Sequence, residues 1–381
     1  VLLLFLLLLL AHRNTLTSIT ALLFLFCCAL YAPAGMTYGK INNSFIVALL
    51  QTTTDEAAEF TGMIPVYHFL VSAAIQVFMV IFWRTHRRGH RNWLALLLFV
   101  LCSINSWPLR MVKGTVVGTT DTLREMQRYK QLNQHGADNW KILPGVPLYD
   151  TIVIVTGESV RRDYMSVYGY PVPTTPWLNT APGLFIDGYT SAAASTVPSL
   201  SRTLIYDYEQ NPDSGNNVVA LAAKAGYSTW WISNQGKLGE HDTRISVIAS
   251  DAEHTVFLKK GSFASRKTDD MLLLQETERA LADKSSPKVI FLHMMGSHPN
   301  PCDQLHSWSN NYQERFPRKI ACYLASISKL DNFLGQLDGI LRRHSRHFAM
   351  LYVFCTMVCR SATVLILFIM MVMCREATAF P

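Results

Sequence analysis

Residues 148–159, LYDTIVIVTGES, predict the strand on which the rest of the fold is built. β-Branched residues dominate this run and a glycine lies near its end, which is typical of a strand buried on both faces. Similar runs stand at 227–233 (YSTWWIS) and 288–296 (KVIFLHMMG), and residues 217–226 and 269–283 have the pattern of helices between them. Strands that alternate with helical crossovers predict an α/β domain with a mostly parallel sheet.

The residue that closes this first strand carries chemical information. Glu158 follows Gly157 at the carboxyl end of the predicted strand, and ligands of parallel sheets gather at that edge. A carboxylate fixed there could hold a divalent metal ion. The alternative is that Glu158 caps the next helix, and its position alone supports both interpretations.

The remainder of the chain divides into apolar ends and a globular middle. The 381 residues include 34 basic and 27 acidic side chains, a net charge of +7, and only 16% of residues are charged. This composition excludes a disordered chain, a disulfide mini-protein and a fibrous repeat. The domain division that follows has a transmembrane helical part at 1–108, a linker at 109–144, a catalytic domain at 145–348 and an apolar tail at 349–381.

The apolar N-terminal part predicts membrane helices at about 1–11, 16–34, 66–83 and 93–107, the first of them too short to span a bilayer. An arginine cluster between positions 84 and 91 separates two of these runs, and such clusters favour the cytoplasmic side. It therefore indicates membrane topology and not a nucleic-acid partner. With this cluster in the cytoplasm, the loop 35–65 lies outside and the large domain is exported.

Two cysteines of the exported domain, Cys302 and Cys322, predict a disulfide, because an oxidising compartment favours the bond over free thiols. Neither has the spacing of a metal site.

After Glu158 the chain continues GESVRRDYMSVYGYPVPTTPWLN, followed by the small-residue loop TSAAASTVPSLSRTL. With these motifs it resembles the membrane-anchored phosphoethanolamine transferases of the alkaline phosphatase and sulfatase superfamily, near 35–60 and over nearly all of 145–343. The resemblance implies a multi-pass protein of the bacterial inner membrane with a periplasmic sulfatase-like domain. It also implies Zn2+ and transfer of phosphoethanolamine from phosphatidylethanolamine, a membrane lipid, to an envelope glycan through a phosphorylated threonine.

The same resemblance assigns roles to individual residues. It makes Glu158 a zinc ligand and Thr196 both the nucleophile and a ligand, with Ser195 and Thr190 as alternatives. Read without the family, Thr196 is a loop hydroxyl before a proline. His298, after the predicted strand 288–296, stands where the family keeps a histidine that faces the transferred phosphate.

Three further residues are implied to bind substrates. Thr52 and Glu56 match a family motif near the lipid headgroup, although Ala48 stands where many members carry asparagine. A polar helix start explains the same residues equally well. Asn234 resembles a residue on the acceptor side, and a turn-forming asparagine is the alternative.

The tail departs from the family, whose domain continues with a D-H-G segment and a later histidine that complete the zinc site. Here residues 349–374 are apolar and read at face value as a span, interrupted by Arg360. Reading the codons of residues 368–374 two bases later gives a sequence compatible with H-H-D-G-N-V, and the same shift across 355–359 accommodates H-G-L. We interpret the tail as out of frame from about Cys355, which would leave this chain without those ligands and inactive.

Within the family, the segments SNQGKLGEHDTRIS, GSHPNPCDQL and ACYLASISKLDNFL resemble the branch that modifies osmoregulated periplasmic glucans more than the enzymes with a lipid-linked sugar acceptor. The alternatives are a sulfatase-like or phosphodiesterase hydrolase and a non-catalytic, truncated membrane protein. No C/S-x-P-x-R motif for formylglycine occurs, which disfavours a sulfatase.

Overall fold

The computed structural model falls into two compact units, residues 1–127 and 128–381, and each is described by itself. It describes residues 15–39, 61–62, 64–85, 116–117, 120, 139–143, 145, 147–186, 191–193, 196–206, 215–235, 244–259, 268–285, 287–298, 300–344, 348–356 and 367–373.

The first unit contains the helices α2 (Thr15–Tyr38) and α5 (Val66–Thr85). Each includes a stretch long and apolar enough to cross a membrane, Ser18–Thr37 and Val66–Arg84. These stretches match two of the predicted runs, whereas the predicted runs 1–11 and 93–107 lie outside the described residues.

Polar contacts join α2 to α5. The Ser72 hydroxyl donates to the carbonyl of Ala29 at 2.7 Å, and Thr37 Oγ1 lies 2.8 Å from His68 Nδ1. Thr37 follows Ala29 in α2, whereas its partner His68 precedes Ser72 in α5, so the two helices run antiparallel. Interhelical hydrogen bonds of this kind fix the register of helices whose remaining surface is apolar.

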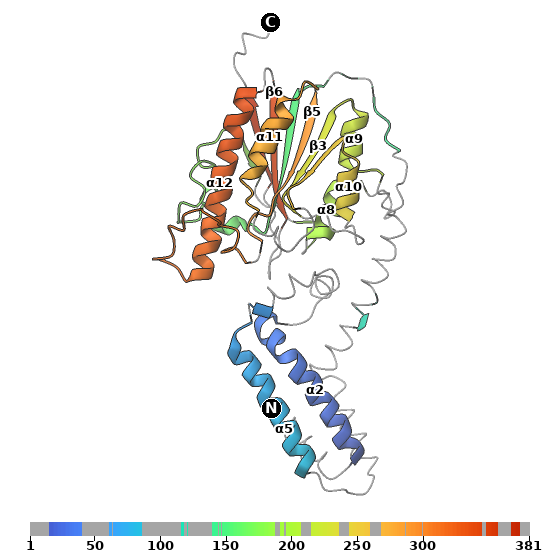
Figure 1. The fold of residues 1–381 in the computed structure, drawn as a ribbon, viewed down its shortest axis with the longest axis vertical. Coiled ribbons are helices and arrows are strands. Elements are labelled where there is room, and N and C mark those ends of the chain that lie inside the picture. The colour runs from blue at the N-terminus through green and yellow to red at the C-terminus, as the bar shows by residue number, and fades with distance from the viewer. Residues whose placement is uncertain are drawn as a thin grey trace. The chain divides into compact units, whose positions relative to one another are not determined.

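The second unit is built on one sheet with the order β2-β7-β6-β1-β5-β3-β4 (Figure 1). Its strands are β1 (Thr151–Glu158), β2 (Leu184–Ile186), β3 (Ser228–Ser233), β4 (His254–Phe257), β5 (Lys288–His293), β6 (Phe348–Thr356) and β7 (Leu367–Met373). β1 pairs in parallel with both β5 and β6, and only β7 runs against its neighbours. The predicted mostly parallel α/β sheet is confirmed.

Helices cover both faces of this sheet (Figure 1). The helices are α8 (Thr196–Leu204), α9 (Val218–Lys224), α10 (Arg244–Ser250), α11 (Leu272–Ala282) and α12 (Arg318–His344), with the 3-10 turns η1 (Arg162–Tyr164) and η2 (Ser166–Tyr168). The two faces have separate cores: α11 and α12 pack on one, and α8, α9 and α10 on the other.

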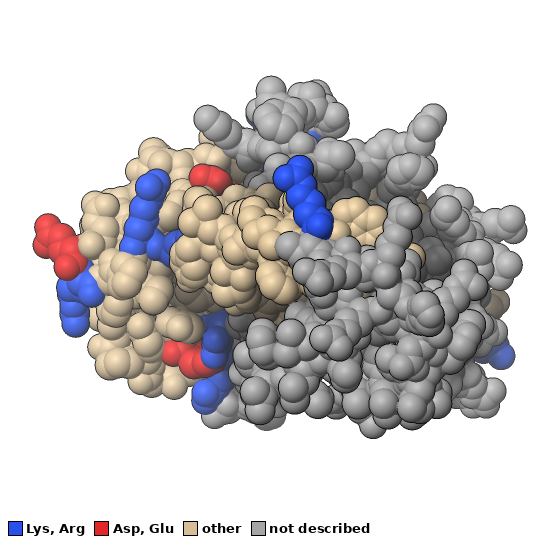
Figure 2. All heavy atoms as spheres, turned by 90° about the horizontal axis from the view of Figure 1, so that it is seen from below, with Lys and Arg blue, Asp and Glu red and all other residues tan. Residues whose placement is uncertain are grey.

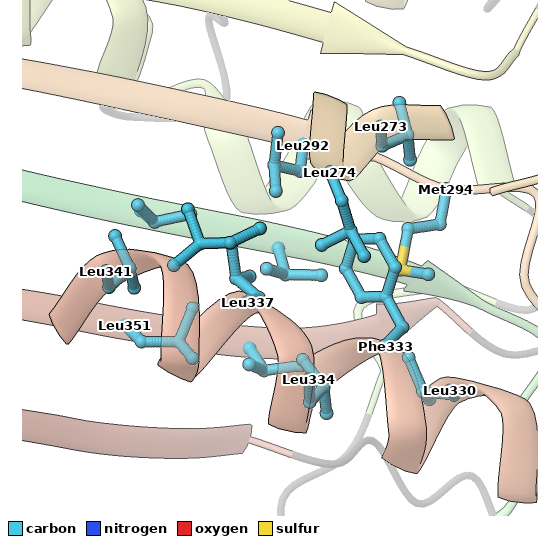
Figure 3. Packing of buried hydrophobic residues seen from close by; sticks show 14 of the residues in the cluster. Leu273, Leu274, Leu292, Met294, Leu330, Phe333, Leu334, Leu337, Leu341 and Leu351 are labelled. Carbon is cyan, nitrogen blue, oxygen red and sulfur yellow. The ribbon is translucent and has the colours of Figure 1, made fainter. Parts of the chain in front are cut away.

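Alternation along β5 shows how one strand serves both cores. Val289 and Phe291 belong to the α8 side, whereas Ile290 and Leu292 belong to the α12 side, where Phe333 fills the centre (Figure 3). Both sets are buried, so the strand is apolar at each position from 289 to 292, which is why it reads as a continuous hydrophobic run.

The apolar tail predicted at 349–381 contributes β7 and all but the first residue of β6 to this sheet. β6 lies beside β1 along its whole length and β7 lies beside β6. A strand buried on both faces has the same composition as a short membrane run, and periodicity alone does not distinguish them.

α12 holds the loop before β2 through a buried carboxylate. Asp331 accepts hydrogen bonds from the backbone N–H groups of Trp177 and Leu178, both at 2.9 Å. Burial raises the pKa of Asp331 from its ordinary 3.8 to about 6, against the opposing effect of these two hydrogen bonds.

This elevated pKa predicts a pH dependence. The folded pKa exceeds the unfolded one, so the folded state binds more protons between pH 3.8 and about 6, and stability falls as the pH rises through that window. The stability of the wild-type domain relative to Asp331→Asn, which does not titrate, should fall by at most about 3 kcal/mol over this range. Thermal unfolding of both proteins across the window measures it, and a constant difference would contradict the assignment.

Candidate active site

Glu158, the last residue of β1, is the centre of the site. Its side chain is buried, with 1% of the residue exposed. Oε1 accepts a hydrogen bond from the Ser159 hydroxyl at 2.7 Å, and Oε2 accepts one from the Thr196 hydroxyl at 2.8 Å. The structure thus brings together the two residues predicted as nucleophile and metal ligand, which are 38 positions apart in the sequence.

The backbone turns sharply after Glu158. Ser159 has a φ of 55°, a left-handed conformation that is costly for a residue with a side chain and that persists only where the surroundings enforce it. The Tyr323 hydroxyl of α12 enforces it here, because it donates to the Ser159 carbonyl at 2.9 Å and accepts from the Arg161 N–H at 2.8 Å.

Thr196 is the first residue of α8, so its hydroxyl lies where the helix dipole favours negative charge. The preceding small-residue loop is tied to this helix. Ser191 Oγ lies 2.8 Å from Ser199 Oγ, and Arg202 donates to the Ala192 carbonyl at 2.9 Å. The alternative hydroxyls Ser195 and Thr190 lie outside the described residues.

The loop after β5 packs against the backbone of Glu158. Gly296 has a φ of 55°, and a Cβ there would lie 2.7 Å from the Glu158 carbonyl oxygen, so only glycine fits. The Ser297 N–H donates to that carbonyl at 2.9 Å, and the Ser326 hydroxyl of α12 donates to Ser297 Oγ at 2.8 Å. His298 follows Ser297 directly in the chain and is half-buried. Because Ser297 is bonded to the Glu158 carbonyl, the backbone at His298 lies at the same sheet edge as Glu158.

Asp270 fixes this loop from the other side. One carboxylate oxygen accepts from the Met295 N–H at 2.8 Å and from the Asn234 amide at 2.7 Å, and the other accepts from the Gly296 N–H at 2.7 Å. Asn234 is fully buried in this contact, so no surface of its side chain is open to an acceptor in this structure. The predicted substrate residues Thr52 and Glu56 lie outside the described residues.

His293, the last residue of β5, is buried. Burial lowers its pKa from 6.5 to about 4, so the ring is neutral at physiological pH. Its Nδ1 lies 3.4 Å from Ser233 Oγ, a weak contact, and its Nε2 has no hydrogen-bond partner among the described residues.

These residues fit a metal ion only in part. Glu158 and Thr196 present two oxygen donors side by side, but zinc is usually held by about four ligands. No group of three or more His, Cys, Asp or Glu side chains that could hold a metal occurs within the described part of the chain. The described residues therefore supply two oxygen donors, fewer than the usual ligand set of zinc.

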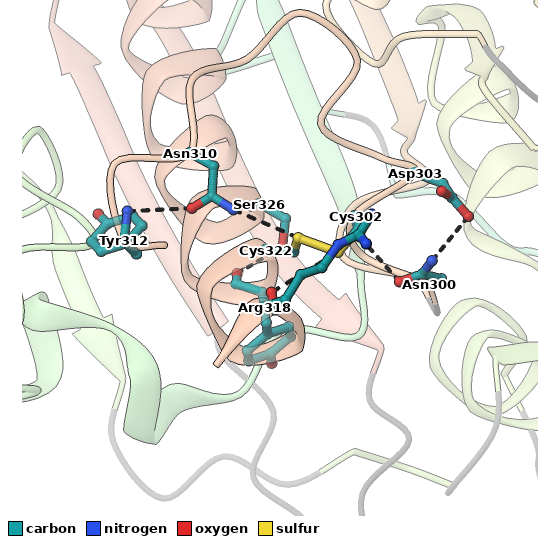
Figure 4. The surroundings of a disulfide bond; sticks show 9 residues. Asn300, Cys302, Asp303, Asn310, Tyr312, Arg318, Cys322 and Ser326 are labelled. Atoms are coloured by element: carbon teal, nitrogen blue, oxygen red, sulfur yellow. Dashed lines mark hydrogen bonds between the residues drawn. A yellow bond between two sulfur atoms is a disulfide. The ribbon is translucent and has the colours of Figure 1, made fainter. Parts of the chain in front are cut away.

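The predicted disulfide between Cys302 and Cys322 is confirmed (Figure 4). It joins the loop after His298 to the first turns of α12, next to Tyr323. Asn310 donates to Cys322 Sγ at 3.6 Å, and Tyr312 donates through its hydroxyl to the Pro173 carbonyl at 3.2 Å. The long loop before α12 is thereby fixed at several points.

Comparison with known proteins identifies the family. The sulfatase family profile matches residues 150–354. A putative phosphoethanolamine transferase of Haemophilus influenzae is 35% identical over 85% of this chain and 70% of that protein. The chain belongs to the membrane phosphoethanolamine transferases of the alkaline phosphatase superfamily.

Other members of the family extend the comparison. The phosphoethanolamine transferase OpgE of Escherichia coli is 32% identical over 85% of this chain and 66% of its own length. The integral membrane lipooligosaccharide phosphoethanolamine transferase A of Neisseria meningitidis has a TM-score of 0.64 at 16% identity, over 93% of this chain and 77% of that one. The C-terminal periplasmic domain of EcEptC from Escherichia coli, in complex with Zn, has a TM-score of 0.50 at 20% identity, over 58% and 73%.

The family and fold predicted from the sequence are confirmed by these likenesses. The chain spans about two thirds of the length of the two curated transferases, 70% and 66%.

Sequence reasoning missed Asp270, Tyr323 and Ser326, which position the site. Tyr323 and Ser326 lie in a segment that indicated the branch of the family but no role in the site, because their roles depend on contacts with distant segments: Tyr323 lies 164 positions from Ser159. Of the features that shape the site, only the sharp turn after Glu158 is indicated by local sequence, through the Gly-Glu-Ser sequence at the end of the strand.

The Tyr323 hydroxyl bridges the Ser159 carbonyl and the Arg161 N–H, and this role predicts a local change in hydrogen exchange when the hydroxyl is removed. Tyr323→Phe removes two hydrogen bonds, so the amide of Arg161 should lose about 5- to 30-fold of its protection against hydrogen exchange. Mass-spectrometric exchange on the peptide that contains residue 161 measures this. Tyr227→Phe, whose hydroxyl donates to the Tyr149 carbonyl at 3.3 Å, is the control, and equal exchange in wild type and Tyr323→Phe would contradict the role.

Proposed function

We propose that this chain derives from an enzyme that transfers phosphoethanolamine from phosphatidylethanolamine to an envelope glycan through a phosphorylated Thr196. The observation that carries the proposal is the 2.8 Å hydrogen bond from the Thr196 hydroxyl to the buried Glu158 carboxylate. Family membership supports the reaction class. Two helices able to cross a membrane support an anchored, multi-pass protein of the inner membrane with its catalytic domain in the periplasm.

In the first half-reaction, Thr196 Oγ1 attacks the phosphorus of the donor. A bond forms between that oxygen and phosphorus, the bond from phosphorus to the diacylglycerol oxygen breaks, and diacylglycerol leaves with a proton. A glycan hydroxyl oxygen then forms a bond to the phosphorus of the phosphothreonine, the bond between phosphorus and Thr196 Oγ1 breaks, and Thr196 takes up the proton that the glycan hydroxyl loses. Glu158 orients the Thr196 hydroxyl through Oε2, and the N-terminus of α8 favours the negative charge placed on Thr196.

Glu158 and Thr196 would hold Zn2+ in the complete site. A bound zinc ion lowers the pKa of a hydroxyl and stabilises charge on a phosphoryl group. His298, on the loop bonded to Glu158, is proposed to face the phosphate, and Thr52 and Glu56 are proposed to contact the donor headgroup. For Asn234 the contact with Asp270 supports a role in positioning the loop.

The phosphorylated intermediate predicts a covalent adduct. Purified protein in which the reading frame is restored from residue 355 should, after incubation with phosphatidylethanolamine and Zn2+, carry phosphoethanolamine on Thr196, detected by mass spectrometry of the peptide. Thr196→Ser should retain the adduct, Thr196→Val should lack it, and Glu158→Gln should reduce its formation at least about a hundredfold. An adduct on Thr196→Val protein would contradict the assignment of the nucleophile.

We further propose that the missing metal ligands belong directly after β6, and that the printed sequence leaves the frame there. Two observations support this: β6 pairs Thr356 with Glu158 at the metal edge of the sheet, and the sulfatase match ends at residue 354. The codon shift at residues 355–359 begins at the same point.

Restoring the frame predicts recovery of the site. The restored protein should bind Zn2+ and form the Thr196 adduct, whereas the chain as printed should do neither, because half a metal site lacks both charge neutralisation and geometry. Sequencing of the locus and metal analysis of both purified proteins test this. An intact printed frame that also yields the adduct would overturn the frame hypothesis and leave the transfer reaction standing.

A further inference from the structure

An aromatic surface that also carries two arginines borders the catalytic turn, and the mechanism does not use it. It consists of Tyr164 and Tyr170 on the segment after Glu158, Tyr312 and Arg315 on the disulfide-tied loop, and Arg161 between them. We call this set the tyrosine surface.

The rings of this surface lie against one another. Tyr164 lies 5.3 Å from Tyr170 between ring centroids and 5.4 Å from Tyr323 in an edge-to-face arrangement. The guanidinium of Arg161 lies 5.4 Å from the centroid of the Tyr164 ring. Tyr323 bonds to the backbone on either side of the catalytic turn, so this surface begins one residue away from Glu158.

These side chains are only partly buried. Tyr164 and Tyr312 pack against buried clusters, yet both are half-buried, as Tyr170 is, and Arg315 is exposed. The 3-10 turns η1 and η2 contain no buried residue. Partial exposure leaves part of each ring accessible to a ligand.

The second segment of the surface is fixed independently of any ligand. The Cys302–Cys322 disulfide ties its loop to α12, and the Tyr312 hydroxyl bonds to the Pro173 carbonyl, close to Tyr170 in the chain. Tyr170 lies within electrostatic range of Tyr164, Arg315 and Tyr312, and burial raises the pKa of its phenol. The surface is therefore preorganised, which reduces the entropy cost of binding.

The composition of the surface indicates the class of ligand. Phenol rings offer a rigid apolar face and a polar edge, which suits a sugar ring with C–H groups on its faces and hydroxyls around its rim. A lipid surface instead requires exposed aliphatic side chains, and Ile320 is the only strongly exposed large aliphatic residue described in 159–181 and 300–323. On the face shown in Figure 2, the described residues carry charges of both signs, some of them side by side, and no continuous basic field.

We propose that the tyrosine surface binds the sugar rings of the acceptor and so presents a glycan hydroxyl to the transferred phosphoryl group. This inference rests on the proposed function for the identity of the acceptor. It makes Tyr164, Tyr170 and Arg315 specificity-determining residues that act by binding, separate from the transfer chemistry at Thr196.

Sugar binding tests this independently of catalysis. Detergent-solubilised full-length protein is titrated with a short linear gluco-oligosaccharide, and binding is followed by saturation-transfer difference NMR. Tyr170→Ala and Arg315→Ala should each weaken binding about tenfold. Tyr170→Phe, which keeps the ring, should lose less than about fivefold.

The matched control is Tyr206→Ala. Tyr206 is 55% exposed and packs on Trp140, away from the catalytic turn, so its removal should leave sugar affinity unchanged. Unaltered thermal unfolding of Tyr170→Ala shows that the fold is retained, because this side chain is largely at the surface.

Three results would overturn the proposal. They are the absence of saturable sugar binding by the wild-type protein, equal affinity of wild type and both alanine variants, and binding of the surface to anionic lipid vesicles in place of sugar. The Thr196 adduct is formed from the donor alone, so its absence reports on the proposed function and not on this surface.

Discussion

The parallel pairing of β1 with both β5 and β6 is the constraint on which the site depends. Parallel strands all end at one edge of a sheet, so side chains distant in the sequence meet there. Glu158 ends β1, the loop carrying His298 leaves β5, and Thr356 of β6 lies in register with Glu158. Burial of the strands on both faces fixes this register, since a slip by one residue would exchange the residues of the two cores.

α12 stabilises that edge by contacting separate loops from successive turns. Tyr323 holds the catalytic turn, Ser326 holds the loop before His298, and Asp331 holds the loop at Trp177. Lys329 adds a 2.7 Å ion pair with Asp269 and a 2.7 Å hydrogen bond to the Gln304 carbonyl. These polar groups are buried, and burial is tolerated because each has hydrogen-bond partners. A buried carboxylate or ammonium without partners would cost several kcal/mol, so the loops and the helix depend on one another.

Local sequence predicted the central strands well, because a β-branched run bounded by a glycine has few alternatives. The predicted run 148–159 contains β1, and the runs 227–233 and 288–296 contain β3 and β5. Glu158 and Thr196 could be singled out through the family motif, but their hydrogen bond could not, since it depends on how the loop before α8 returns to the sheet. α12 and its site contacts were also beyond reach. Its polar residues point at loops whose positions only the folded sheet defines, as the separation of 153 positions between Leu178 and Asp331 illustrates.

The position of β6 explains how this fold and its chemistry can be separated. Residues 348–354 are needed for the sheet, because they pair with β1 and contribute Leu351 and Val353 to the core. The sulfatase match ends within this strand, at residue 354, two residues before its end opposite Glu158. A change of frame at that point would leave the apolar pairing of β6 intact and replace the residues that emerge at the metal edge. The scaffold would then keep the pairing of β1 with β5 and β6, while the zinc ligands that we propose beyond residue 355 would be lost.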